Sequence, residues 1–93
     1  MPEPASPALR DTGARYEMDE QGLTAYADYR REGGRLIVDY VYAPPELRGT
    51  GASGRLMAAL SADARDRGLT ITPLCGYAAA WLRRSQEFAG LVG

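Results

Sequence analysis

The chain contains no histidine, no lysine and no asparagine, and these absences remove several kinds of active site. Without histidine there can be no Ser-His-Asp triad, no imidazole general base and no histidine-bound metal. Without lysine there can be no Walker-type phosphate loop, because that loop needs the lysine ammonium group. Acid–base chemistry must therefore use a carboxylate, a tyrosine, a cysteine, a bound water molecule or the substrate itself.

Cysteine is nearly absent too, since Cys75 is the only one in 93 residues. A single cysteine excludes a disulfide within the chain and a metal site built from several thiolates. The formal net charge is −1, which argues against electrostatic capture of nucleic acid or of an acidic membrane. No apolar run approaches the roughly 20 residues that cross a bilayer, and the first residues do not resemble a signal peptide. We therefore expect a cytoplasmic protein that binds neither nucleic acid nor membrane.

Residues 1–12 hold three of the six prolines among small and charged residues. This composition predicts a flexible N-terminal tail in front of one domain formed by residues 13–93. Hydrophobic residues make up 45% of the chain, so a domain of this size can fold without metals or disulfides.

Four segments have the alternating or β-branched pattern of strands: residues 15–19, 23–31, 35–43 and 69–72. Apolar residues with helical spacing predict an amphipathic helix that ends at Gly68 and a second helix over residues 76–84. Residues 86–92 predict one more helical turn. This order predicts an α+β fold, with a mostly antiparallel sheet of about four strands covered by two or three helices.

The most informative segment joins the third strand to the first helix and reads Ala43-Pro44-Pro45-Glu46-Leu47-Arg48-Gly49-Thr50-Gly51-Ala52-Ser53. A glycine-rich turn between a strand and a helix can direct unpaired backbone N–H groups and the positive end of the helix dipole at an anion. Short glycine patterns also occur in ordinary loops. The flanking strand and helix, with Arg48 at the front of the turn, favour a site for a phosphorylated cofactor.

These residues resemble the acetyl-coenzyme A (acetyl-CoA) signature of the GNAT acetyltransferase superfamily, written Arg/Gln-x-x-Gly-x-Gly/Ala. Ser53 stands where that pattern has Gly or Ala, and it is small enough to leave room for a pyrophosphate. Further segments follow in the order found in the short, single-domain GNAT-like N-acetyltransferases, and the resemblance covers roughly residues 14–92. They are Arg15-Tyr16-Glu17, residues 25–30, Gly33-Gly34, Ala64-Arg65 with Gly68, and Pro73-Leu74-Cys75-Gly76-Tyr77.

The resemblance implies a minimal GNAT-like fold and transfer of an acetyl group from acetyl-CoA to an amine that the sequence does not identify. It implies that the strand ending at Tyr42 and Ala43 pairs its backbone with the pantetheine arm. It also implies that the pyrophosphate is wrapped by Arg48, Gly49, Thr50, Gly51, Ala52, Ser53 and Gly54. The alternative is a coenzyme A-binding or interaction module without efficient catalysis, because so small a domain lacks the helices that usually wall the acceptor groove. Both a monomer and a homodimer fit.

Cys75 is the candidate catalytic residue. It directly precedes the predicted helix over residues 76–84, and a helix N-terminus favours the nucleophilic thiolate. The resemblance places such a cysteine near the acetyl end of the cofactor, which implies either a covalent acetyl relay or a thiol lining the pocket. A lone cysteine can also be a small buried hydrophobe. All three interpretations stay open.

Three further features have an ordinary structural interpretation beside a functional one. By resemblance, Tyr77 could donate a hydrogen bond to the leaving thiolate, but its place on the apolar helix face favours a core position. Asp39 interrupts an apolar strand, and we interpret it as facing outward from a sheet that is covered on one side. Arg83 and Arg84 are typical of a solvated helix end, although they could also meet the 3′-phosphate of the cofactor.

Overall fold

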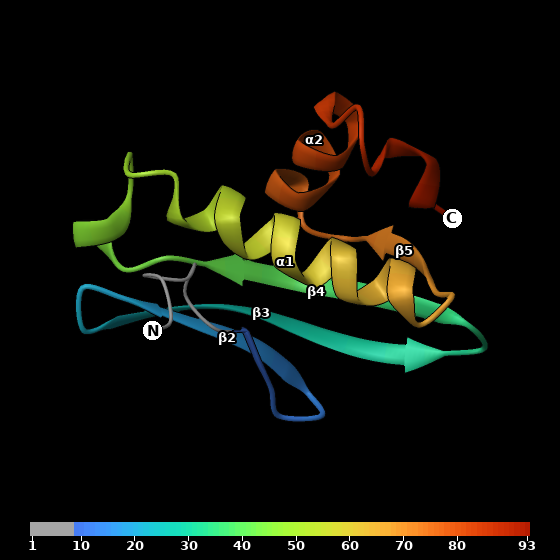
Figure 1. Ribbon diagram of the computed structural model, residues 1–93, viewed down its shortest axis with the longest axis horizontal. Coiled ribbons are helices and arrows are strands. Elements are labelled where there is room, and N and C mark those ends of the chain that lie inside the picture. Colours follow the sequence, from blue (N-terminus) through green and yellow to red (C-terminus); the bar gives the residue numbers. More distant parts are fainter. Residues whose placement is uncertain (1–8) are drawn as a thin grey trace, which may run out of the picture.

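Five strands lie side by side in chain order in the computed structural model, which describes residues 9–93 (Figure 1). Strands β1 to β4 are antiparallel to their neighbours, and β5 runs parallel to β4. The strands are β1 Leu9–Asp11, β2 Arg15–Glu20, β3 Leu23–Glu32, β4 Arg35–Tyr42 and β5 Thr70–Pro73. The sheet is therefore mostly antiparallel, with one parallel edge.

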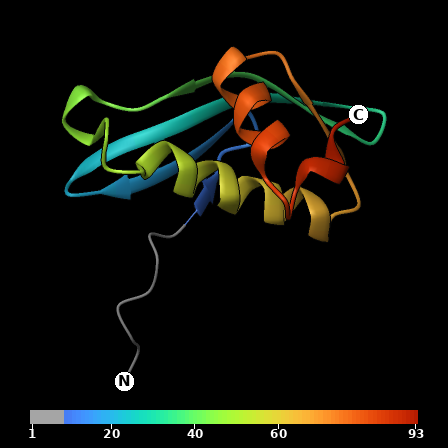
Figure 2. The same cartoon turned by 90° about the horizontal axis from the view of Figure 1, so that it is seen from above.

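Two helices cover one face of this sheet (Figure 2). Helix α1, Ala52–Asp66, makes the crossover from β4 to β5 and packs against β2 and β3, whereas α2, Gly76–Arg84, packs against β4 and β5. Two short 3₁₀ turns, η1 Pro45–Leu47 and η2 Ala89–Leu91, complete the described chain. None of the helices within residues 9–93 is long and apolar enough to span a membrane.

The core between the sheet and the helices follows the sequence pattern. In β3 the alternating residues Ala25, Ala27 and Tyr29 are buried against the helices, as expected for a strand that is covered on one face. In α1 the buried stripe includes Leu56 and Leu60. The predicted α+β class, the order of its elements and both α-helices are confirmed.

The predicted tail is wrong where it includes Leu9–Asp11, because these residues form β1 and raise the number of strands to five. This strand has no alternating pattern, and charged groups hold it in place. Arg10 donates to Asp19 at 2.7 Å and to Glu17 at 3.1 Å, both on β2. Residues 1–8 of the predicted tail lie outside the described residues.

Strand β4 contains a β-bulge at Asp39. Tyr29 pairs with Val38 and the preceding residue, Asp28, pairs with Tyr40, so Asp39 has no partner on β3. Its carboxylate accepts hydrogen bonds of 2.9 and 2.8 Å from the Arg30 guanidinium. Arg30 belongs to the face of β3 that the helices leave open, so the outward interpretation of Asp39 is confirmed.

Candidate functional site

The site begins where β4 and β5 separate. Their pairing ends at Val38 and Pro73, followed by one last hydrogen bond of 2.9 Å from the Leu74 N–H to the Val38 carbonyl. Beyond this point β4 continues through the bulge over residues 39–42, and no strand among residues 9–93 pairs with it on that side. A strand edge of this kind offers backbone donors and acceptors to an extended ligand.

The turn that follows β4 is held by hydrogen bonds to its own backbone. The Thr50 hydroxyl donates to the Leu47 carbonyl at 2.6 Å and accepts from the Ala52 N–H at 3.3 Å. Leu47 is buried and anchors the turn in the core. Gly49 and Gly51 have φ angles of 82° and 88°, in the left-handed region that glycine adopts without strain.

This arrangement leaves backbone donors at the start of α1 without acceptors. Within residues 9–93, no acceptor pairs with the N–H groups of Gly49, Gly51, Ser53 and Gly54. Gly51 is the N-cap residue of α1, so the positive end of a 15-residue helix dipole lies at the same place. Unpaired N–H groups together with a helix N-terminus form a site suited to phosphate.

A cleft of about 310 Å³ lies over this turn. It brings together six of the nine residues predicted to bind the cofactor and adds Leu47 and Tyr77; the six are Arg48, Gly49, Gly51, Ala52, Ser53 and Gly54. The other three predicted residues do not line it. Thr50 directs its hydroxyl at Leu47, Tyr42 stacks on Tyr26 with ring centroids 5.1 Å apart, and the Ala43 carbonyl accepts a 3.0 Å bond from Arg48 Nε.

Gly54 allows the two helices to approach each other beside the cleft. A Cβ atom at this position would lie 3.4 Å from Trp81 Nε1 and 3.9 Å from Tyr77 Oη. The absence of a side chain therefore lets α2 approach the start of α1 closely. Gly54 contributes to helix packing as well as to the lining of the cleft.

Tyr77 lies in the cleft, so the expected core position is wrong. The residue is 40% exposed, and its hydroxyl makes no hydrogen bond within residues 9–93. The residue precedes the part of α2 that packs on the sheet, where Ala78 and Leu82 are buried instead. Burial raises the pKa of Tyr77, partly offset by Arg84 and reinforced by Cys75. The phenol is therefore a protonated donor at neutral pH.

Cys75 occupies the N-cap position of α2, with φ −80° and ψ 132°. Its side chain is half-buried and packs against the core. It is close enough to contribute to the raised pKa of Tyr77, but it is not among the residues that line the cleft. Across residues 9–93 no group of three acidic, cysteine or histidine side chains is arranged to hold a metal ion.

An ion pair that the sequence analysis did not single out joins α1 to β2. The Arg55 guanidinium donates from Nε and Nη2 to the Glu20 carboxylate at 2.7 and 2.6 Å. The two residues are 35 positions apart, so no local pattern connects them. Their contact brings a guanidinium next to the glycine turn, because a Cβ atom at Gly51 would lie 3.0 Å from Arg55 Nη1.

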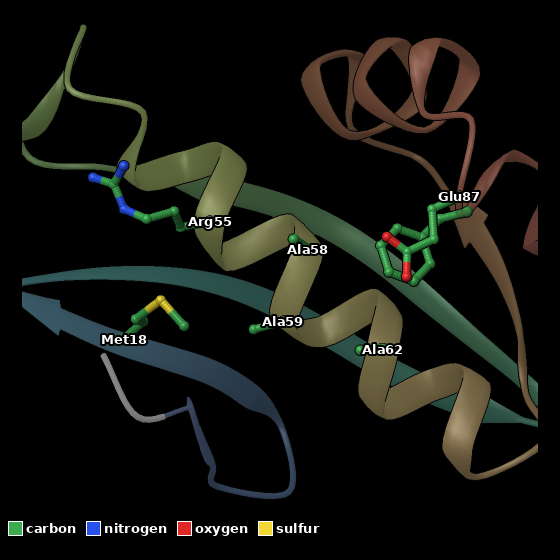
Figure 3. A pocket seen from close by; sticks show the side chains of 7 residues that line it. Met18, Arg55, Ala58, Ala59, Ala62 and Glu87 are labelled. Atoms are coloured by element: carbon green, nitrogen blue, oxygen red, sulfur yellow. The ribbon is translucent and has the colours of Figure 1, made fainter. Parts of the chain in front are cut away.

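A second hollow lies along the outer side of α1 and is a different feature (Figure 3). This groove of about 370 Å³ is lined by Met18, Ala58, Ala59, Ala62 and Phe88, with Arg55 at one end and Glu87 at the other. Its floor is apolar and offers no group for acid–base or nucleophilic chemistry. The chemical groups gather instead at the cleft over the turn.

A family model and solved structures match the chain. A family model described as GCN5-related N-acetyl-transferase matches residues 15–91. The NMR solution structure of a GCN5-like protein from Staphylococcus aureus is similar, with a TM-score of 0.74 and 20% sequence identity, over 96% of this chain and 90% of that chain. At this identity the likeness shows the fold alone. No curated protein matches the chain.

Proposed function

Because the chain belongs to the GCN5-related N-acetyltransferase family, we propose that it transfers an acetyl group from acetyl-CoA to an amine. The observation that carries this proposal is the turn over residues 48–54, whose unpaired N–H groups and helix N-terminus line one cleft. The pyrophosphate of coenzyme A supplies the negative charge that such a site binds. This use of the turn accounts for glycines with left-handed φ angles on both sides of Thr50.

The pantetheine arm then lies along the free edge of β4, where Tyr42 and Ala43 bring the strand to the turn. The arm carries amide groups, which can pair with the strand as an added strand would. Arg48 already bonds the Ala43 carbonyl, so the arm pairs with the backbone groups of residues 39–42. This path places the thioester where β4 and β5 separate, between Val38 and the first turn of α2.

In direct transfer, the amine nitrogen attacks the thioester carbonyl and the carbon–sulfur bond breaks. The sulfur leaves with the bonding electrons and takes a proton from the Tyr77 phenol. The nitrogen loses a proton to water, and solvent returns one to the tyrosinate. Backbone N–H groups of β4 stabilise the oxyanion that forms during attack. Histidine and lysine are absent and no carboxylate among residues 9–93 lines the cleft, so in this proposal the amine arrives neutral or loses its proton to solvent.

A covalent relay through Cys75 is the second route. The thiolate would attack the thioester, release coenzyme A and carry the acetyl group before the amine takes it. Cys75 follows β5, where this path puts the thioester, and Tyr77 lines the cleft over the turn, so an acetyl adduct on Cys75 is the observation that separates the relay from direct transfer. If neither route operates, the chain is a coenzyme A-binding module, and it would bind the cofactor without releasing free thiol.

Replacement of Gly51 by Val tests the proposal. Valine cannot adopt the φ of 88° without strain, and its Cβ would approach Arg55, so the turn must distort. We expect Gly51→Val to abolish acetyl-CoA binding in isothermal titration and acetyl transfer to a panel of amines. Gly13→Val is the matched control, because Gly13 has a φ of 95° in a turn away from the cleft. Equal cofactor affinity in Gly51→Val and the parent protein would refute the site.

A further inference from the structure

We propose that the Arg55 guanidinium binds the 3′-phosphate on the ribose of the cofactor. The proposal rests on the proposed function, since it requires coenzyme A to be bound at the turn over residues 48–54. Coenzyme A carries three phosphate groups, two in the pyrophosphate and one on the ribose. The turn accounts for the first two, and Arg55 provides a separate positive charge for the third.

The Arg55 side chain is oriented by a contact on only one side of its guanidinium. Nε and Nη2 donate to the two carboxylate oxygens of Glu20, and Nη1 has no acceptor among residues 9–93. Nη1 is the atom that lies 3.0 Å from a Cβ placed on Gly51, so it is directed at the phosphate-binding turn. Figure 3 shows the guanidinium directed toward the start of α1 and away from Glu87.

Arg55 lies beside the cleft and outside it. Gly51 lines the cleft over the turn, whereas Arg55 lines the start of the groove on the outer side of α1. In this proposal the N–H groups of the turn hold the pyrophosphate inside the cleft, and Nη1 holds the remaining phosphate on the other side of Gly51, at the start of the groove.

Glu20 keeps this arginine in position at neutral pH. The hydrogen bonds from Arg55 hold the pKa of Glu20 below its usual range, so the carboxylate stays ionised. The Glu20 side chain is 11% exposed and Arg55 is 45% exposed, so the pair is fixed on the protein side and open to solvent on the ligand side. A guanidinium fixed in this way loses less side-chain entropy when it binds a phosphate.

Two other arginines are near the cleft: Arg48 lines it, and Arg84 is close enough to Tyr77 to act on the pKa of that phenol. Arg83 lines a separate pocket with Pro73, Ala79, Ala89 and Val92, away from the turn. Arg65 is also on α1, ten positions after Arg55, and it pairs with Glu87 at 3.1 Å. Arg65 is therefore a matched control: an exposed arginine of the same helix, with one carboxylate partner and no access to the turn.

The experiment compares dissociation constants for coenzyme A and for dephospho-coenzyme A, which lacks only the 3′-phosphate. We expect the parent protein to bind coenzyme A about 5- to 10-fold more tightly, as one charge-assisted hydrogen bond at an exposed site provides. Arg55→Ala should reduce the ratio of the two dissociation constants to about 1, because it weakens the binding of coenzyme A and not that of dephospho-coenzyme A. Arg65→Ala should keep the ratio, and Arg55→Lys, which retains the charge, should keep part of it.

Each outcome separates this inference from the proposed function. If the parent binds coenzyme A and prefers it, but Arg55→Ala keeps the full preference, the role of Arg55 is refuted. A parent protein that binds both ligands equally refutes it as well. If the ion pair had only a structural role, Arg55→Ala would weaken the binding of both ligands by the same factor. If the parent binds neither ligand, the proposed function itself fails.

Discussion

We expect substitution by alanine to change the stability of the fold in opposite directions at Ser61 and at Ser85. Ser61 is fully buried in α1, and its Oγ atom has no hydrogen-bond partner in the part of the chain that the structure describes. A buried hydroxyl without a partner costs about 1–3 kcal/mol, and alanine is the better helix former by about 0.5 kcal/mol. We therefore expect Ser61→Ala to stabilise the fold by about 1.5 kcal/mol, which raises Tm by about 6–12 °C for a domain of this size.

The Ser85 hydroxyl, in contrast, accepts a 3.0 Å hydrogen bond from the Phe88 N–H after α2. Ser85→Ala leaves that donor without its acceptor, so we expect a loss of about 1 kcal/mol. Thermal unfolding followed by circular dichroism measures both changes, and urea titration shows whether the m-value stays constant. A lower Tm for Ser61→Ala, or a shift of the same sign in both variants, would refute this reasoning about the buried hydroxyl.

The remaining predictions concern Tyr77 and Cys75, which the proposed function puts beside the thioester. Tyr77→Phe should lower kcat about 100-fold with KM for acetyl-CoA little changed, and Tyr26→Phe, which keeps the ring that stacks on Tyr42, is the control. Because the pKa of Tyr77 is raised, its contribution should persist through neutral pH and be lost only as pH rises into the alkaline range. Cys75→Ala should keep cofactor binding and acetyl transfer if transfer is direct; loss of transfer, together with an acetyl adduct on the parent protein in mass spectrometry, would establish the relay.

Much of the architecture could be predicted because its signals are local. The strands β2 to β5 and both α-helices follow from side-chain periodicity, and the turn between β4 and α1 follows from glycines between a strand and a helix. Strand β1 could not be predicted, because Leu9–Asp11 has no periodicity and depends on the pairing of Arg10 with another strand. The contact between Glu20 and Arg55 could not be predicted either, because the two residues are 35 positions apart and meet only in the tertiary structure.

Tyr77 shows the limit of helix periodicity in the site itself. Its spacing from the other apolar residues of α2 predicts burial, and the helix does bury Ala78 and Leu82. The first turn of α2, however, lies where β4 and β5 have separated, so there is no closed sheet for Tyr77 to cover. The pattern identifies an apolar face, but only the tertiary structure shows where that face meets an opening.

The bulge at Asp39 makes β4 a place where the chain can lose one residue. Strand β4 is one residue longer than its pairing with β3 requires, and the surplus residue lies just where β5 stops pairing. Deletion of Asp39 would let Tyr40 follow Val38 directly, and every later side chain of β4 would keep both its partner and its face. Only the bend and the added twist that a bulge gives its strand would disappear. A change of one residue in length would thus redirect the free edge of β4 while sparing the fold, so the spacing between Val38 and Tyr40 sets the course of that edge beyond β5.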